Sequence, residues 1–272
     1  MLFRSKEPLR ANEMPTLDVT ARLADLVNRH PSLAGGLERR GLDYCCGGNR
    51  TLIEACRPLG LDAGETAREL SEELTPEPEG DWVGMGPTEL VDHIEATHHR
   101  YLHEELPRLG ALADKVEAVH GANHTGLPAV VDTFRALRAD LEPHLMKEER
   151  ILFPMVRDLM AATDLPAFHC GSIGNPISVM ILEHHGAGKL LDQLVDLTGG
   201  FQPPADGCAS FNAFYRGLAE LNTDTRMHIH KENNSLFPAV SRIEKDLLAV
   251  GTGLEFEVTG PDEPLSDSVA PH

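Results

Sequence analysis

Apolar positions along the chain follow helical spacing, first in short segments and then in long ones. Within Thr16–Arg29 the apolar side chains recur every three or four residues, which predicts an amphipathic helix. Three further short helices are predicted on the same ground, at Leu33–Arg40, Thr51–Cys56 and Ala63–Leu74. Between them lies a glycine-rich turn with two adjacent cysteines, GLDYCCGG. The first 75 or so residues are therefore predicted to form a small helical module.

Four long helical stretches follow, at Pro87–Val119, Leu127–Met160, Pro176–Leu197 and Ala209–Leu248. Segments rich in Gly, Pro or Asn separate them, as expected of turns between helices. Alternating runs of β-branched residues are scarce, so strands are not predicted. Four long helices with modest connections predict an all-α fold whose main part is an antiparallel four-helix bundle.

The composition of two segments suggests boundaries. TPEPEGDWVGMGP is rich in Pro, Gly and acidic residues, which is typical of a linker. We therefore expect a small domain at residues 1–75, a linker at 76–86 and the bundle at 87–248. Residues 249–272 mix Gly, Pro, Asp and Glu, and are expected to form a disordered acidic tail.

An internal repeat is the most informative feature of the bundle. HLMKEERILFPMV at His144–Val156 and HIHKENNSLFPAV at His228–Val240 share H-x-x-K-E-x-x-x-L-F-P-x-V. A single His-x-x-x-Glu pair would be a weak signal, but a duplicated one is not. Residues four apart lie on one face of a helix, so an imidazole and a carboxylate can reach one ion. This ligand pair suits iron, manganese or zinc.

The shared Leu-Phe-Pro stretch has its own predicted consequences. Leu152, Phe153, Leu236 and Phe237 would seal the bundle beyond the ligands. Pro154 and Pro238 lack an N–H and should kink or locally loosen their helices.

The repeat extends upstream to one histidine in each half. His184 lies 44 residues before His228, and His99 lies 45 residues before His144. Each half then offers one histidine and one His-x-x-x-Glu pair, and the two halves together could hold two metal ions with bridging carboxylates. The first histidine is not fixed by spacing alone, because His93, His98 and His103 compete with His99, and His98 matches His184 if the paired histidines are aligned.

The other histidines are given lesser roles. His185 and His230 are expected to support the ligands from outside the site or to be exposed. His120, His124 and His169 are expected to lie in loops.

Charge and cysteine content exclude several classes of function. The formal net charge of −19 argues against binding to nucleic acid or to anionic lipid, both of which need clustered Lys and Arg. No run of about 18 apolar residues predicts a membrane span, and the N-terminus lacks the apolar core of a signal peptide, so a cytoplasmic location is expected. Five cysteines do not form a secreted disulfide framework, and Cys56, Cys170 and Cys208 are treated as ordinary thiols.

These motifs resemble the iron–sulfur cluster repair di-iron proteins, the repair-of-iron-centres family. The resemblance rests on five segments: GLDYCCGGNRTL, DHIEATHHRYLHEELP, HLMKEERILFP, GNPISVMILEHHGAG and HIHKENNSLFP. It spans about Thr16 to Ile243 and implies a CCGG-containing N-terminal domain before a haemerythrin-like bundle. Arg100 and His185 stand where the family pattern leads us to expect an acidic residue.

The resemblance also implies the metal centre. Two iron ions, bridged by an oxo or hydroxo group, would be held by six residues: His99, His144, Glu148, His184, His228 and Glu232. Glu148 and Glu232 would bridge the irons. The ungapped match over Asp92–Pro107 favours His99 over His98.

The implied function is repair of iron–sulfur clusters damaged by nitrosative or oxidative stress, through donation of iron, with damaged iron–sulfur proteins as clients. Two alternatives use the same centre: an enzyme that reduces nitric oxide, and a haemerythrin-like module that binds or senses O₂. Cys45 and Cys46 are candidates for a redox role. A homodimer through the small module is compatible with the sequence.

Overall fold

The computed structural model describes residues 17–75 and 80–252. Within these ranges the chain is helical and contains no β-strand, which confirms the predicted all-α class. None of the helices described is long and apolar enough to cross a bilayer.

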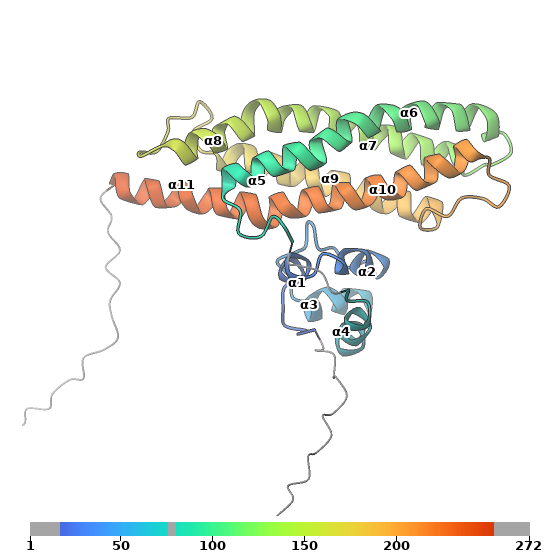
Figure 1. The fold of residues 1–272 in the computed structure, drawn as a ribbon, viewed down its shortest axis with the longest axis horizontal. Helices are drawn as coiled ribbons and strands as arrows, with labels where there is room; N and C mark the ends of the chain where they lie inside the picture. The colour runs from blue at the N-terminus through green and yellow to red at the C-terminus, as the bar shows by residue number, and fades with distance from the viewer. Residues whose placement is uncertain (1–16, 76–79, 253–272) are drawn as a thin grey trace, which may run out of the picture.

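Four rods of helix lie along the long axis of the molecule and form the bundle (Figure 1). Three of them consist of two α-helices joined by a π-helical turn. These are α5 (Pro87–Ile94), η2 (Glu95–His99) and α6 (Arg100–His120); α7 (Leu127–Lys147), η3 (Glu148–Leu152) and α8 (Phe153–Ala161); and α10 (Ala209–Lys231), η4 (Glu232–Leu236) and α11 (Phe237–Thr252). The fourth rod is the uninterrupted α9 (Gly174–Thr198). The rods match the four predicted stretches to within a few residues.

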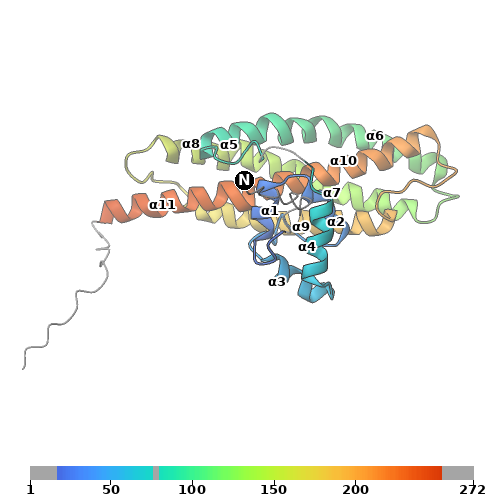
Figure 2. The ribbon, with the colours of Figure 1, turned by 60° about the horizontal axis from the view of Figure 1, so that its bottom comes forward.

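The small module consists of short helices at the N-terminal end of the described chain. They are α1 (Leu23–Arg29), α2 (Leu33–Arg39), α3 (Leu52–Cys56), η1 (Arg57–Leu59) and α4 (Ala63–Glu72). Thr51 and Glu54 form a capping box that starts α3, and the Asp62 side chain caps α4. The CCGG segment forms the turns between α2 and α3. Figures 1 and 2 show the module beside the middle of the bundle.

The first helix is shorter than predicted. Thr16 lies outside the described residues, and α1 starts only at Leu23. The backbone before Leu23 instead forms hydrogen bonds with the start of α3, which follows the CCGG segment. Leu52 N–H donates to Ala21 O at 3.0 Å, and Ile53 N–H donates to Val19 O at 3.0 Å. Tertiary hydrogen bonds therefore override the helical spacing of the apolar positions here.

Part of the predicted linker packs against the module. Residues 76–79 lie outside the described chain, but Gly80 N–H donates to Asn28 O at 2.9 Å and Trp82 Nε1–H to Asn28 Oδ1 at 3.0 Å. Trp82 is buried. The predicted tail begins at residue 249, but α11 continues to Thr252. Residues 253–272 lie outside the described chain.

Two apolar clusters occupy the bundle, and the polar site lies between them. Leu102, Phe134 and Phe214 belong to one cluster, which extends into the module. The other cluster contains the four predicted sealing residues, Leu152, Phe153, Leu236 and Phe237, all of them buried.

The π-turns mark the level of the polar site. In η2, η3 and η4 the N–H that follows the turn bonds the carbonyl of the turn's first residue, five positions back. Pro154 and Pro238 lie just after η3 and η4, where local loosening is predicted. The same turn at Glu95–His99 forms with no proline directly after it, so proline is not required for a π-turn in this bundle.

Candidate metal centre

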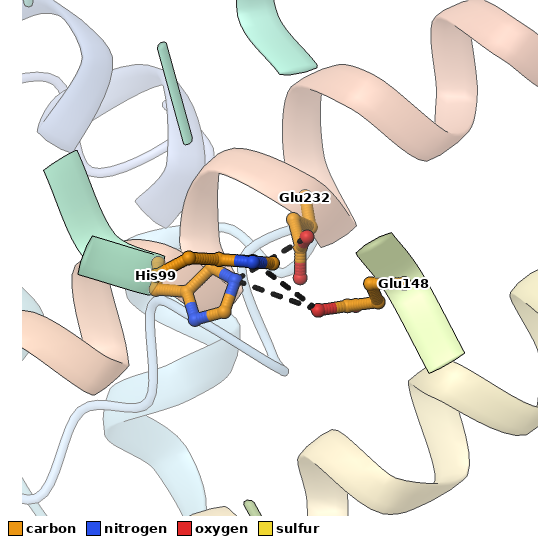
Figure 3. A group of neighbouring side chains, drawn as sticks. His99, Glu148 and Glu232 are labelled. Atoms are coloured by element: carbon orange, nitrogen blue, oxygen red, sulfur yellow. Dashed lines mark ion pairs between the residues drawn. The ribbon is translucent and has the colours of Figure 1, made fainter. Parts of the chain in front are cut away.

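The structure brings all six residues of the predicted ligand set into one buried cluster. Glu148 and Glu232 are the first residues of η3 and η4, and His99 is the last of η2. His144 and His228 lie one helical turn before the glutamates, and the sixth residue, on α9, is His184. Each of the six is at most 3% exposed. Figure 3 shows His99, Glu148 and Glu232 with their polar ends turned toward one another.

Each carboxylate offers one oxygen to each half of the cluster. Glu148 Oε1 lies 3.2 Å from His144 Nε2, and its Oε2 lies 3.5 Å from His99 Nε2. Glu232 repeats this arrangement, with Oε2 3.1 Å from His184 Nε2 and Oε1 3.3 Å from His228 Nε2.

The ligand atoms therefore form two four-residue groups that could each hold a metal ion. One group contains His99 and His228, the other contains His144 and His184, and both contain the two glutamates. Shared carboxylates between two imidazole pairs are the arrangement expected of a two-metal site.

Several buried polar atoms that face the centre of this cluster have no hydrogen-bond partner among the described residues. Neither carboxylate oxygen of Glu148 or of Glu232 has a hydrogen-bond partner among the described residues, nor has Nε2 of His99 or His228. Burying two unpaired carboxylates is costly unless cations or protons offset their charge. Burial lowers the pKa of His144, but Glu148 and Glu232 outweigh that effect and raise it to about 9. The donor set therefore fits bound cations.

Acceptors on the outer side orient three of the four imidazoles. Nδ1 of His99 lies 3.0 Å from Glu149 Oε1, Nδ1 of His144 lies 2.8 Å from Glu183 Oε2, and Nδ1 of His184 lies 2.9 Å from Asn233 Oδ1. An Nδ1–H that donates outward leaves the Nε2 lone pair directed at the site, which is the usual support of a metal-binding histidine.

Comparison with known proteins agrees with this architecture. The hemerythrin HHE cation binding domain family matches residues 90–240, and a domain of unknown function, DUF542, matches residues 19–74. The chain is 37% identical over 224 residues to the iron–sulfur cluster repair protein YtfE of Dickeya chrysanthemi, covering 82% of this chain and 97% of that one. It is 36% identical over 222 residues to a probable iron–sulfur cluster repair protein of Haemophilus influenzae, covering 80% and 96%. YtfE of Yersinia pestis is 38% identical over 204 residues, covering 75% and 88%.

The chain belongs to the haemerythrin-like family of iron–sulfur cluster repair proteins. This membership confirms the resemblance inferred from the motifs and the haemerythrin-like fold.

Three residues that orient the ligands, Glu149, Glu183 and Asn233, were not predicted from the sequence. Glu149 and Asn233 directly follow the two shared glutamates and occupy the same position of the internal repeat. Both accept a hydrogen bond from an imidazole of the centre. The sequence signal for Glu149 and Asn233 was therefore their shared position in the repeat, directly after each shared glutamate. Arg100 is exposed, and His185 is exposed with Nδ1 2.7 Å from Ile181 O, so the expected acidic support comes instead from Glu149 and Glu183.

The competing histidines lie beside the two groups rather than in them. His98 is buried, with Nδ1 2.8 Å from Asp224 Oδ1, and its ring stacks on His228 at 5.5 Å. His93 Nε2 lies 2.8 Å from Lys231 Nζ, and His103 Nε2 lies 2.7 Å from Glu149 Oε1.

The remaining histidines differ from expectation at two positions, His230 and His120. His230 is buried where the module meets the bundle, with Nε2 2.9 Å from Asn28 Oδ1. His124 and His169 lie in turns and loops as expected. His120 does not, because α6 continues one residue further than predicted and ends on it.

The two adjacent cysteines form a tight turn outside the bundle. The Asp43 carboxylate accepts the backbone N–H of Cys45 at 3.1 Å and that of Cys46 at 2.9 Å. Both thiols are free and their sulfurs are 3.9 Å apart, with Cys45 buried and Cys46 partly exposed. The hydrogen bond with Cys46, followed by burial, raises the pKa of the Cys45 thiol well above its usual value. Cys208, by contrast, is exposed and lies 3.2 Å from His120 Nε2.

A cavity of about 220 Å³ borders the centre at His144. It is lined by residues of α7 and α9: Asp140, Leu141, Pro143, His144, Lys147, Glu183 and Gly186. Lys147 forms an ion pair with Glu183, the carboxylate that also accepts from His144.

Proposed function

We propose that this protein repairs damaged iron–sulfur clusters by holding two iron ions and donating iron to the damaged cluster. The observation that carries the proposal is the pair of buried histidine groups with two shared glutamates and unpaired carboxylate oxygens. Relatives that are 36–38% identical over most of the chain bear the name iron–sulfur cluster repair protein. Nitrosative or oxidative stress is the proposed source of the damage.

The proposed ligands are the six clustered residues, with Glu148 and Glu232 bridging the irons. Bound iron would supply a redox-active pair able to bind small ligands such as NO or O₂. The protein's part is to present four Nε2 lone pairs and four carboxylate oxygens in a dry site. A mixed set of imidazole and carboxylate donors without thiolate binds Fe(II) with moderate strength, which suits a store that must give iron up.

The cavity beside His144 supports the proposal that the bound iron can also leave the protein. Its lining includes the acidic side chains Asp140 and Glu183, which favour a cation on its way out. His144, which lines this cavity together with the Lys147–Glu183 ion pair, lies with its Nε2 3.2 Å from Glu148 Oε1.

The other parts of the proposal concern organisation and surroundings. We propose residues 1–75 and 87–248 as the two domains, with Cys45 and Cys46 in a redox role next to the client. Five free cysteines suit a reducing compartment, and we propose the cytoplasm. The homodimer stays a prediction.

An anaerobic transfer assay tests the function. The Fe(II)-loaded chain should reactivate an iron–sulfur enzyme whose cluster has been destroyed by NO, with iron lost from the chain appearing in the enzyme. Glu148→Ala, which removes a shared carboxylate, should fail to reactivate it. Rapid NO consumption without iron transfer would favour the NO-reductase alternative, and reversible O₂ binding without either activity would favour the haemerythrin-like alternative.

A further inference from the structure

The two halves of the metal centre are supported in different ways. His99 is held by Glu149, which also accepts from His103, so that every partner lies on the bundle. His184 is held by Asn233, which occupies the same position of the repeat. One half thus has a carboxylate where the other has a neutral amide.

The amide makes a contact that a carboxylate could not. Asn233 Nδ2 donates to the carbonyl oxygen of Cys45 at 3.3 Å, while its Oδ1 accepts from His184 at 2.9 Å. A carboxylate has no hydrogen to donate and would repel that carbonyl. Because the Cys45 carbonyl accepts from Asn233 Nδ2, the amide is oriented with its Oδ1 toward His184.

A second asparagine ties the same loop to the bundle without touching a ligand. Asn234 Nδ2 donates to Cys45 O at 3.0 Å and lies 3.3 Å from Tyr44 O. Gly48 makes room for this contact, since a Cβ there would come within 2.5 Å of Asn234 Oδ1. The loop is thus fixed at the one point where it meets the support of His184.

The loop also lies against α9, the helix that carries His184. Cys46 Sγ is 3.8 Å from the point where a Cβ on Gly188 would stand, one helical turn beyond His184. A movement of the two-cysteine loop therefore changes both the amide behind His184 and the packing of its helix.

We propose that Asn233 is a positioning residue through which the Tyr44–Cys46 loop controls the His144/His184 half of the metal centre. With the loop docked, Asn233 holds the His184 ring toward the metal. When the loop is displaced, the ring loses its support and the metal of this half leaves first. The inference rests on the proposed function in one respect, that the released metal is the iron to be donated.

Iron release from the full chain tests the coupling. The Fe(II)-loaded protein is mixed anaerobically with excess ferrous-iron chelator, and the release of each of the two irons is followed as a separate phase. Asn233→Ala and Asn234→Ala should each speed the loss of one iron by about tenfold, the lower end of what loss of a ligand's supporting partner costs. The other iron should leave at the wild-type rate. His184→Ala should hold a single iron and lack the accelerated phase.

A matched control and a double variant separate coupling from general loosening. Asn175→Ala removes another asparagine–carbonyl bond, the 2.7 Å contact from Nδ2 to Cys170 O, which involves neither the module nor a ligand of the centre. It should leave both phases unchanged. Asn233→Ala/Asn234→Ala should be no faster than Asn233→Ala alone, because both act through one contact.

The outcomes are decisive either way. Wild-type kinetics in Asn234→Ala, equal acceleration of both irons, or the same effect from Asn175→Ala would overturn the coupling. If Asn233→Ala does not fold, Asn234→Ala decides, because it touches no ligand. Accelerated release in a protein that repairs no cluster would refute the proposed function and leave the coupling standing.

Discussion

Nε2 of His144 lies 3.1 Å from Nε2 of His184, although both rings already use Nδ1 for an acceptor on the outer side. A neutral imidazole carries one hydrogen, so two rings that donate through Nδ1 direct two lone pairs at each other. Such lone pairs repel unless a cation or a proton lies beside them. The contact therefore requires a proton on His144, whose pKa the two glutamates raise, or a metal ion beside both rings.

Removing a shared carboxylate should affect both metal positions. Glu148→Ala should leave well below one metal ion per chain, because Glu148 belongs to both groups. His99→Ala should keep about one, because His144 and His184 are untouched. Metal analysis after anaerobic reconstitution measures the difference. Glu142→Ala, an exposed partner of Arg138, should bind as much metal as the wild type. Equal metal content in the Glu148 and His99 variants would contradict a bridging role.

The two neighbouring histidines should differ sharply in their effect on metal content. His98 bonds Asp224 and only stacks on His228, whereas His99 Nε2 points at Glu148. We expect His98→Ala to retain two metal ions per chain and His99→Ala to lose one, measured on the same preparations. The opposite result would place the ligand one position earlier.

The thiols of Cys45 and Cys208 should react at different rates. The raised pKa of Cys45 leaves little thiolate at pH 8, and the reactive species is the thiolate. Cys45 should be alkylated much more slowly than exposed Cys208, because it is buried and carries less thiolate. Its rate should still rise with pH above 9. Peptide mapping by mass spectrometry gives the rates, and the five thiols should react alike in urea. Fast labelling of Cys45 would refute its burial.

The contact between module and bundle should depend on Glu38. Its two oxygens accept from Tyr44 Oη at 2.9 Å and from Asn222 Nδ2 at 2.8 Å. Glu38→Ala leaves both donors without this partner, which should lower the free energy of unfolding by about 1–3 kcal/mol. Urea unfolding measures the loss. Glu69→Ala, which removes a partly exposed ion pair with Arg40, should cost less than about 1 kcal/mol. Similar losses in both variants would show that Glu38 acts only through surface charge.

The sequence by itself determined the features that depend on local spacing. Helical periodicity placed the four rods, and the four-residue interval put His144 near Glu148 and His228 near Glu232, because neighbours on one helix face are set by the chain alone. The internal repeat predicted a centre with two equivalent halves, each with the same kinds of ligand. The same periodicity failed before Leu23, where the chain forms a turn and hydrogen-bonds to residues some 30 positions away.

Spacing alone left His98 and His99 open and the family resemblance favoured His99; the tertiary structure places His99 in the cluster, where a π-turn ends on it and shifts the helix register. It alone placed Asn233 between His184 and Cys45, residues that are 49 and 188 positions away from it in the sequence. No spacing rule reaches across such intervals, since these contacts exist only once the module has packed against the bundle.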